Sequence, residues 1–260
     1  MNAALSVSHV SYRYPDGRNA VTDVTFTVDE GEAVGVIGPN GAGKTTLLLL
    51  VTGLLSPEQG EISVFGKTYW DAYSDEDDRE VRRRLGFVPH GTEDQLFSAT
   101  LFDDVAFGPL NFGVPREAVR ARVTEALRKV GLSGYEERVP HHLSSGERRR
   151  AALATVLSYE PDLLVLDEPS NDLDPRGRSE LVGLLRATDQ GRIVASCDFE
   201  FILRTCDRVL VLDAGRVIAD GATADILCDR ALLEAHGLEV PLGLRGRSPA
   251  QVRELLEAEG

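Results

Sequence analysis

The sequence predicts an α/β fold, and three segments carry that prediction. Apolar residues at Val24, Phe26 and Val28 alternate with polar ones, which is the pattern of a strand with one buried face. Two short apolar runs, residues 33–37 and 163–166, are typical of buried strands in a parallel sheet. The first run leads through a glycine-rich loop into an apolar segment of helical length, so strands and helices alternate along the chain.

Composition and charge exclude several classes of protein. The chain has 260 residues, of which 42% are apolar and 27% charged, so it has enough material for a large core. The longest apolar run, "LLLLVTGLL", has about nine residues, whereas a bilayer span needs roughly twenty. No N-terminal segment has the pattern of a signal peptide, so we expect a cytoplasmic chain. A net charge of −14 argues against a nucleic-acid partner.

The cysteines do not form a recognisable metal or disulfide pattern. Cys197, Cys206 and Cys228 are odd in number and too far apart for a close-paired zinc site. We therefore expect reduced thiols. Cys197 stands in "VASCDFEF", directly after an apolar run.

The glycine-rich loop has the pattern of a phosphate-binding loop. Gly38, Gly43, Lys44 and Thr45 match G-x-x-x-x-G-K-[ST] between a buried strand and a helix. Glycines let backbone N–H groups close around phosphate oxygens, the helix N-terminus adds partial positive charge, and the lysine reaches the terminal phosphates. Thr45 would hold Mg²⁺. The alternative is a glycine-rich turn with an incidental lysine.

Two acidic residues end the second buried run. Asp167 and Glu168 follow residues 163–166, and in a parallel sheet that end faces the phosphate loop. Asp167 can then bind Mg²⁺ through water, and Glu168 can polarise an attacking water. The alternative is that both residues cap the next turn. Together with the phosphate loop, they predict nucleotide hydrolysis.

Between these motifs, the segment "LSSGE", Leu143 to Glu147, opens a strongly helix-favouring run. Here the sequence resembles the ATP-binding-cassette (ABC) ATPases, whose signature reads L-S-G-G-Q or L-S-G-G-E. Ser145 stands where the family has a glycine. The resemblance assigns the signature's phosphate contacts to Ser144 and Gly146, which are both present.

The resemblance covers nearly the whole chain and implies its architecture. The expected fold is that of a P-loop NTPase, with a RecA-like core that includes an antiparallel β portion and an inserted α-helical subdomain. The ABC ATPase domain would span residues 1–235, its core formed by about 1–90 and 158–235 and its helical subdomain by about 91–157. Residues 236–260 would form a short tail that helps ATPase subunits pair.

The resemblance also implies ATP and Mg²⁺ as cofactors and a head-to-tail dimer. Tyr14 would stack on adenine, although it could instead pack on the sheet. Asp174, in "SNDLDP", would face the partner subunit. The phosphate-loop contacts are assigned to Gly38, Asn40, Gly41, Ala42, Gly43, Lys44, Thr45 and Thr46.

One segment resembles a particular group of cassettes. Residues 92–114, which include "DVAFGPLN", are similar to the segment after the glutamine loop in energy-coupling-factor importers of cobalt, nickel and vitamins. In that group the turn corresponding to Glu93, Asp94, Gln95, Leu96 and Phe97 begins a helix that grips the coupling helices of the membrane subunit. "AHGLEVP" resembles the start of that group's tail.

This likeness implies partners and a location. The partners would be a membrane-embedded coupling subunit, a substrate-binding membrane component and a second ATPase, and the chain would lie peripherally on the cytoplasmic face of the cell membrane. The alternative is a generic helical subdomain of another cassette ATPase.

Two positions depart from the family pattern. His90 stands where the family has the glutamine that touches Mg²⁺ and the attacking water, and Cys197 stands where it has the switch histidine. A thiol is a weak donor and cannot carry the charge of an imidazole. Losing one aimed donor costs about 10²- to 10³-fold in rate, so we expect slow hydrolysis, with Glu168 retained. A nucleophilic Cys197 is disfavoured by its acidic neighbours Asp198 and Glu200.

Other functions and features stay open at this level. The chain could be a hydrolysis-impaired subunit that completes a competent site on a partner ABC ATPase. A soluble cassette ATPase of DNA repair or translation is disfavoured by "DVAFGPLN" and by the charge. The arginines at 82–84 and 148–150 are interpreted as solvated or dipole-complementing helix faces. The acidic stretch 71–80 is interpreted as a solvated helix or loop, since it lacks the spacing of a calcium loop.

Overall fold

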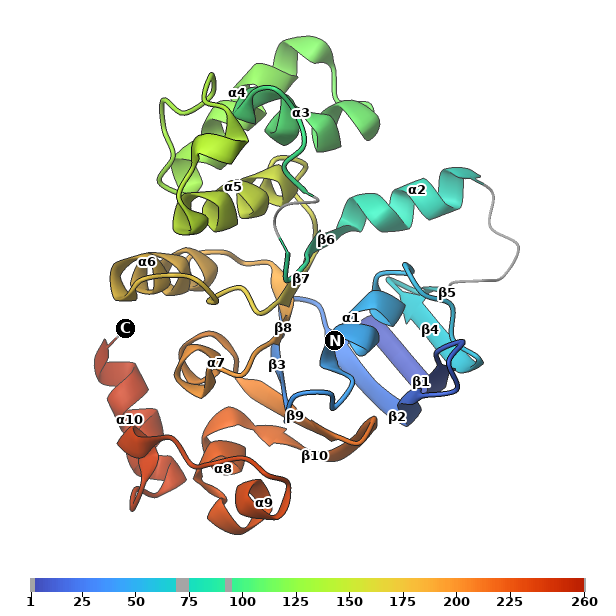
Figure 1. Ribbon diagram of the computed structural model, residues 1–260, viewed down its shortest axis with the longest axis vertical. Helices are drawn as coiled ribbons and strands as arrows, with labels where there is room; N and C mark the ends of the chain where they lie inside the picture. The colour runs from blue at the N-terminus through green and yellow to red at the C-terminus, as the bar shows by residue number, and fades with distance from the viewer. Residues whose placement is uncertain (1–2, 69–74, 92–94, 260) are drawn as a thin grey trace. The chain divides into compact units, whose positions relative to one another are not determined.

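The structure, a computed structural model, describes residues 3–68, 75–91 and 95–259 (Figure 1). The chain divides into two compact units, which are described separately. The first consists of Met1–Ala72 together with Gly191–Gly260, and the second of Tyr73–Gln190. Along the described part of the chain, no helix is both long and apolar enough to cross a membrane.

An antiparallel sheet forms part of the first unit. Its strands are β1 (Ala3–Arg13), β2 (Asn19–Asp29), β4 (Gln59–Val64) and β5 (Lys67–Thr68), in the order β2-β1-β4-β5. In β2 the side chains of Val24, Phe26 and Val28 are buried while the residues between them are exposed. The alternation predicted for this strand is confirmed.

A second set of strands in the first unit is mainly parallel. The buried run forms β3 (Ala33–Ile37), which pairs in parallel with β8 (Gly191–Ala195) and β9 (Arg208–Asp213). Strand β10 (Arg216–Ala222) is antiparallel to β9. Helix α1 (Lys44–Val51) follows β3, and α7 (Phe199–Thr205) packs against β3.

The last part of the first unit is helical. It comprises α8 (Thr223–Cys228), α9 (Arg230–Ala235), the 3₁₀ turn η2 (Leu242–Leu244) and α10 (Pro249–Glu259). Helix α10 packs on α8, with Val252 buried and Arg253 Nη1 3.1 Å from Asp225 Oδ1. The tail is therefore ordered by packing within this unit.

The second unit combines two parallel strands with helices. Strands β6 (Leu85–Val88) and β7 (Leu163–Asp167) pair in parallel. Helices α3 (Leu101–Asn111), α4 (Arg116–Lys129) and α5 (Ser145–Leu157) pack on one another, and α5 also packs against β6. The remaining elements are α2 (Asp75–Arg84), the 3₁₀ turn η1 (Pro140–His142) and α6 (Pro175–Arg186).

Some of the predicted features lie partly outside the described residues. Residues 71–74 of the acidic stretch lie outside them, whereas α2 begins at Asp75. Glu93 and Asp94 of the predicted coupling turn also lie outside them. The helical region predicted at 91–157 contains α3, α4, η1 and α5, but the compact unit also includes both strands and α6. The boundaries of the helical subdomain and of the tail stay predictions.

Candidate functional site

The phosphate loop joins β3 to α1 in the first unit, and its path depends on two glycines. A Cβ on Gly38 would lie 2.0 Å from the carbonyl oxygen of Leu212, and one on Gly43 would lie 2.2 Å from that of Ala20. Gly43 also has a positive φ of 105°. Any larger residue would displace the loop from the end of β9 and the start of β2. These two glycines thus let the phosphate loop pack directly against the backbone of β9 and β2.

Lys44 is buried inside this loop. Its Nζ donates to Gly38 O at 2.8 Å and to Pro39 O at 3.3 Å. Of the two threonines that follow, the first, Thr45, is exposed and the second, Thr46, is buried. The loop therefore presents the Lys44 ammonium group and the Thr45 hydroxyl next to Gly43, whose backbone is left-handed. Donors of these kinds fit phosphate oxygens.

Tyr14 lies beside the helix that follows the loop. Its hydroxyl and the Thr46 hydroxyl are 3.1 Å apart, and the guanidinium carbon of Arg18 lies 4.8 Å from the centre of its ring. The ring also makes an edge contact with Tyr12, with centroids 5.1 Å apart. The structure thus brings Tyr14 to the phosphate loop, and its adenine-stacking role stays a prediction.

Cys197 is brought to the same loop. Its exposed Sγ lies 3.5 Å from Lys44 Nζ and 3.7 Å from Asn40 Oδ1. The Asp198 carboxylate caps α7 by accepting a bond from Phe201 N at 3.0 Å. The sequence identified acidic neighbours of Cys197 but no particular cationic one. No sequence signal links Lys44 to Cys197, because they lie on separate elements.

In the second unit, Asp167 and Glu168 stand at the end of β7, as predicted. Asp167 is buried and Glu168 is half-buried. Glu168 has a φ of 47°, a left-handed conformation that is uncommon for residues other than glycine, asparagine and aspartate. Backbone strain of this kind is concentrated at functional sites, where the surrounding structure holds it.

Arg149 corrects the interpretation of residues 148–150 as a solvated helix face. It is buried, and its guanidinium donates to Pro89 O at 3.0 Å and to His90 O at 2.7 Å. The interpretation was wrong for this residue because α5 packs on β6, which turns Arg149 inward. The His90 side chain itself is exposed.

Charges near Arg149 compensate for its burial. Desolvation lowers the pKa of its guanidinium, and three carboxylates oppose that shift: Asp172, Asp167 and Glu168. A buried cation that faces carboxylates remains charged. Arg149 thus ties the signature helix to the backbone of His90 and acts electrostatically on the predicted hydrolytic residues. It is a functional candidate that the sequence analysis did not single out.

The signature forms one side of a cavity of about 650 Å³ in the second unit. Ser144 is the N-cap of α5 and accepts a bond from Glu147 N, while the Glu147 side chain accepts one from Ser144 N at 2.8 Å. Three predicted site residues line the cavity together: Ser144, Gly146 and Asp174. Ser145 Oγ, at the position of the missing glycine, donates to Asp172 O at 3.4 Å.

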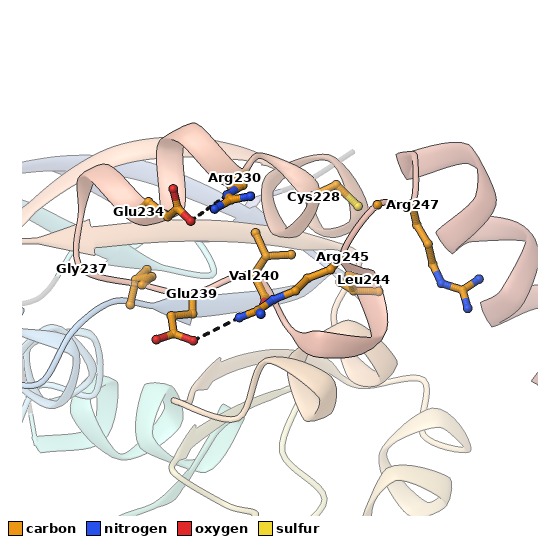
Figure 2. Close-up of a pocket in the computed structure, with 11 residues that line it drawn as sticks. Cys228, Arg230, Glu234, Gly237, Glu239, Val240, Leu244, Arg245 and Arg247 are labelled. Atoms are coloured by element: carbon orange, nitrogen blue, oxygen red, sulfur yellow. Dashed lines mark hydrogen bonds and ion pairs between the residues drawn. The ribbon is translucent and has the colours of Figure 1, made fainter.

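A second cavity, of about 550 Å³, is lined by residues of α8, α9 and the C-terminal tail (Figure 2). Two arginines that line the cavity form ion pairs with glutamates that also line it. Arg230 Nε is 2.7 Å from Glu234 Oε1, and Arg245 Nη2 is 3.3 Å from Glu239 Oε2. None of the predicted ATP-contacting residues lines it.

Within the ranges that the structure describes, no three His, Cys, Asp or Glu side chains gather in a group that could hold a metal ion. A magnesium ion here would depend on phosphate oxygens and water for most of its ligands, as is usual for nucleotide sites. Thr45 and Asp167 each carry the oxygen type of ligand that Mg²⁺ prefers, whereas His90 carries an imidazole nitrogen, and the roles of all three stay predictions.

A comparison with family models decides the assignment. The ABC transporter family model matches residues 21–171, a range that includes the phosphate loop, the signature, Asp167 and Glu168. The chain belongs to the ABC transporter family. This ABC ATPase is 46% identical over 246 residues to a putative ABC transporter ATP-binding protein of Streptomyces coelicolor, covering 95% of this chain and 93% of that protein.

Two further relatives carry more specific names. The energy-coupling factor transporter ATP-binding protein EcfA of Carboxydothermus hydrogenoformans is 44% identical, with 93% of this ABC ATPase and 89% of EcfA covered. The solved structure of CbiO1 from Clostridium perfringens, described as part of the ABC transporter complex CbiONQ, superposes with a TM-score of 0.79 at 32% identity. That superposition covers 99% of this chain and all of CbiO1. The predicted P-loop NTPase fold is confirmed.

Proposed function

We propose that this ABC ATPase is the ATP-binding and hydrolysing subunit that energises an energy-coupling-factor importer for a metal ion, such as cobalt or nickel, or for a vitamin. The likeness to EcfA and CbiO1 supports this function. The chain would bind peripherally to the cytoplasmic face of the cell membrane, beside a membrane-embedded coupling subunit and a substrate-binding component. It would pair with a second ATPase, identical or not.

The observation that carries the proposal is an exposed aromatic pair in the second unit. The side chains of Phe97 and Phe107 are 60% and 51% exposed, and their rings meet edge to face with centroids 5.3 Å apart. Large aromatic side chains grouped on a surface mark an interaction site. Phe97 ends the turn that resembles the one gripping coupling helices, so the pair fits an apolar helix of the membrane subunit.

The aromatic pair is anchored to the signature helix. Gln95 Nε2 donates to Thr155 Oγ1 at 2.8 Å and to Ala152 O at 3.1 Å, both on α5. Asp104 Oδ1 accepts bonds from the backbone N–H groups of Phe97 and Ser98. Because α5 begins at the Ser144 cap, movement of the coupling turn would reach the signature through one helix.

The catalytic roles follow the predicted assignment. The phosphate loop would hold the phosphates, with Lys44 beside the terminal ones. Thr45, Asp167 through water, and His90 would hold Mg²⁺, and a bound Mg²⁺ ion would supply positive charge against the phosphates. Glu168 would polarise the attacking water, and the signature cavity would complete the partner's site.

The test separates the nucleotide site from the coupling surface. Lys44→Ala should abolish Mg-ATP binding by purified protein. The double variant Phe97→Ser with Phe107→Ser should bind ATP normally but no longer co-purify with the membrane subunit from native membranes. Normal ATP binding and transport by Lys44→Ala would refute the proposal, as would full membrane association of the phenylalanine variant.

A second candidate function is favoured by Cys197. A thiol lies beside Lys44 where the family has its switch histidine, while the signature cavity keeps Ser144 and Gly146. Such a chain could retain ATP and complete a competent site on a different partner ATPase. A homodimer that hydrolyses ATP at ordinary rates would exclude this candidate, whereas activity only with a second cassette would favour it.

A further inference from the structure

We infer that His236 and Asp213 are positioning residues, through which the C-terminal tail sets the geometry of the phosphate loop and hence nucleotide affinity. This inference rests on the proposed nucleotide site. His236 Nδ1 donates to Asp213 Oδ2 at 2.8 Å, and both residues lie in the first unit.

Asp213 ends β9, in the turn on which the phosphate loop rests. The residue before it, Leu212, offers the carbonyl oxygen against which Gly38 is packed so closely that no Cβ would fit. Two residues further on, Gly215 N donates to Ala42 O at 2.9 Å. The backbone around Asp213 therefore contacts the phosphate loop at both its beginning and its middle, and a shift of this turn would move the loop.

His236 is held in place by the way α9 ends. Leu238 N donates to Leu233 O at 2.9 Å and Gly237 N to Glu234 O at 3.3 Å, which is a Schellman motif with left-handed Gly237 at φ 69°. Leu233 and Leu238 are both buried, as such a motif favours. His236 is the C-cap residue of this helix, so its backbone position is fixed before its side chain reaches Asp213.

The pair is partly shielded from water. The His236 and Asp213 side chains are 28% and 33% exposed, whereas those of a second pair, His9 and Asp23, are 75% and 61% exposed at the same 2.8 Å separation. Hydrogen bonds between side chains that are less exposed to solvent face less competition from water and hold their geometry better. The second pair lies between β1 and β2 and serves as a matched control.

The tail beyond His236 borders a cavity. Gly237 and Leu238 line the tail cavity of about 550 Å³, whose walls carry their own ion pairs (Figure 2). Repacking around this cavity would act on the adjacent His236. Through Asp213, a shift of His236 would move the turn after β9 that contacts the phosphate loop.

The experiment is a double-mutant cycle on Mg-ADP affinity, measured by calorimetry, since ADP avoids hydrolysis. We expect His236→Ala and Asp213→Ala each to raise Kd about threefold to tenfold, the size of coupling expected within one network. The double variant should bind no more weakly than the weaker single variant. Asp213→Asn, which keeps an acceptor oxygen for His236, should retain most of the affinity.

Controls separate positioning from simple destabilisation. His9→Ala and Asp23→Ala should lower the midpoint of thermal unfolding without changing Kd for Mg-ADP. Additive effects in the His236 and Asp213 cycle, or unchanged Kd in both single variants, would overturn the inference while Lys44→Ala still abolished binding. If the unsubstituted protein failed to bind Mg-ADP, the proposed nucleotide site would fall as well.

Discussion

The ammonium group of Lys44 lies 3.5 Å from the thiol of Cys197, which joins the phosphate loop to the residue in the switch-histidine position. Cys197 is exposed, and Asn40 Oδ1 is 3.7 Å from the same sulfur. Phosphates held by the loop would therefore lie close to this thiol. We therefore expect Cys197 to report nucleotide binding and to affect the hydrolysis rate.

Alkylation should distinguish Cys197 from the other cysteines. We expect iodoacetamide at about pH 8 to modify Cys197 first, since an exposed thiol beside a cation is the more reactive kind. Saturating Mg-ADP should slow the modification at least about tenfold by shielding the sulfur. Peptide mass spectrometry over a time course would measure both rates.

The remaining cysteines provide the internal control. Burial raises the pKa of Cys206 to about 12 and also raises the pKa of Cys228. At the reaction pH their thiols stay protonated, so less thiolate is available and alkylation is slow. Equal rates at Cys197 and Cys206, or no protection by nucleotide, would contradict the placement of Cys197 beside the site.

Restoring the histidine should accelerate hydrolysis. Cys197→His would supply an aimed donor to the transferring phosphoryl group, and such a donor is worth about 10²- to 10³-fold in rate. We expect single-turnover hydrolysis to rise at least about tenfold, with His90 still limiting the full gain. Cys197→Ser is the matched control. An unchanged rate in Cys197→His would refute the role given to this position.

Removing the buried guanidinium should destabilise the second unit and slow hydrolysis. Arg149→Met leaves Pro89 O and His90 O without their donor, a loss of about 2–3 kcal/mol in the free energy of unfolding. Urea titration of this variant and of Arg186→Met, an exposed arginine on α6, would measure the difference. Equal stability of the two variants would show that the hydrogen bonds of Arg149 do not contribute to the free energy of unfolding.

The ring of Tyr14 should matter more than its hydroxyl. If the ring stacks on adenine, Tyr14→Ala should weaken ATP binding by about 1–3 kcal/mol, whereas Tyr14→Phe keeps the stack. Tyr14→Phe loses only the bond to Thr46. Calorimetric Kd values for both variants decide the matter. Similar losses in the two would indicate that the Tyr14–Thr46 bond, and not stacking, supports the site.

Acid should weaken the signature cap. Hydrogen bonds from the backbone and side chain of Ser144, and from Tyr135, lower the pKa of Glu147 below its usual 4.5. A lowered pKa means that the stabilisation is complete above about pH 4.5 and is lost as the pH falls through the folded value. The stability difference between the unsubstituted protein and Glu147→Gln should therefore shrink below that pH. A constant difference in urea titrations would contradict this linkage.

The sequence alone determined the features that depend on neighbouring residues. The buried run at 33–37 and the loop from Gly38 to Thr45 are set by local spacing and lie where predicted, and α5 begins in the segment predicted to open a helix. Hydrogen bonds three or four residues apart and the burial of an apolar face follow from the local order of residues.

Tertiary structure decided the relationships between distant residues. Lys44 with Cys197, Tyr14 with Thr46, Arg149 with His90, and His236 with Asp213 are pairs whose members lie on separate elements. A linear pattern shows that Arg149 is on a helix but not that α5 turns it toward β6. These contacts arise because packing of helices on strands brings side chains together irrespective of their separation in sequence.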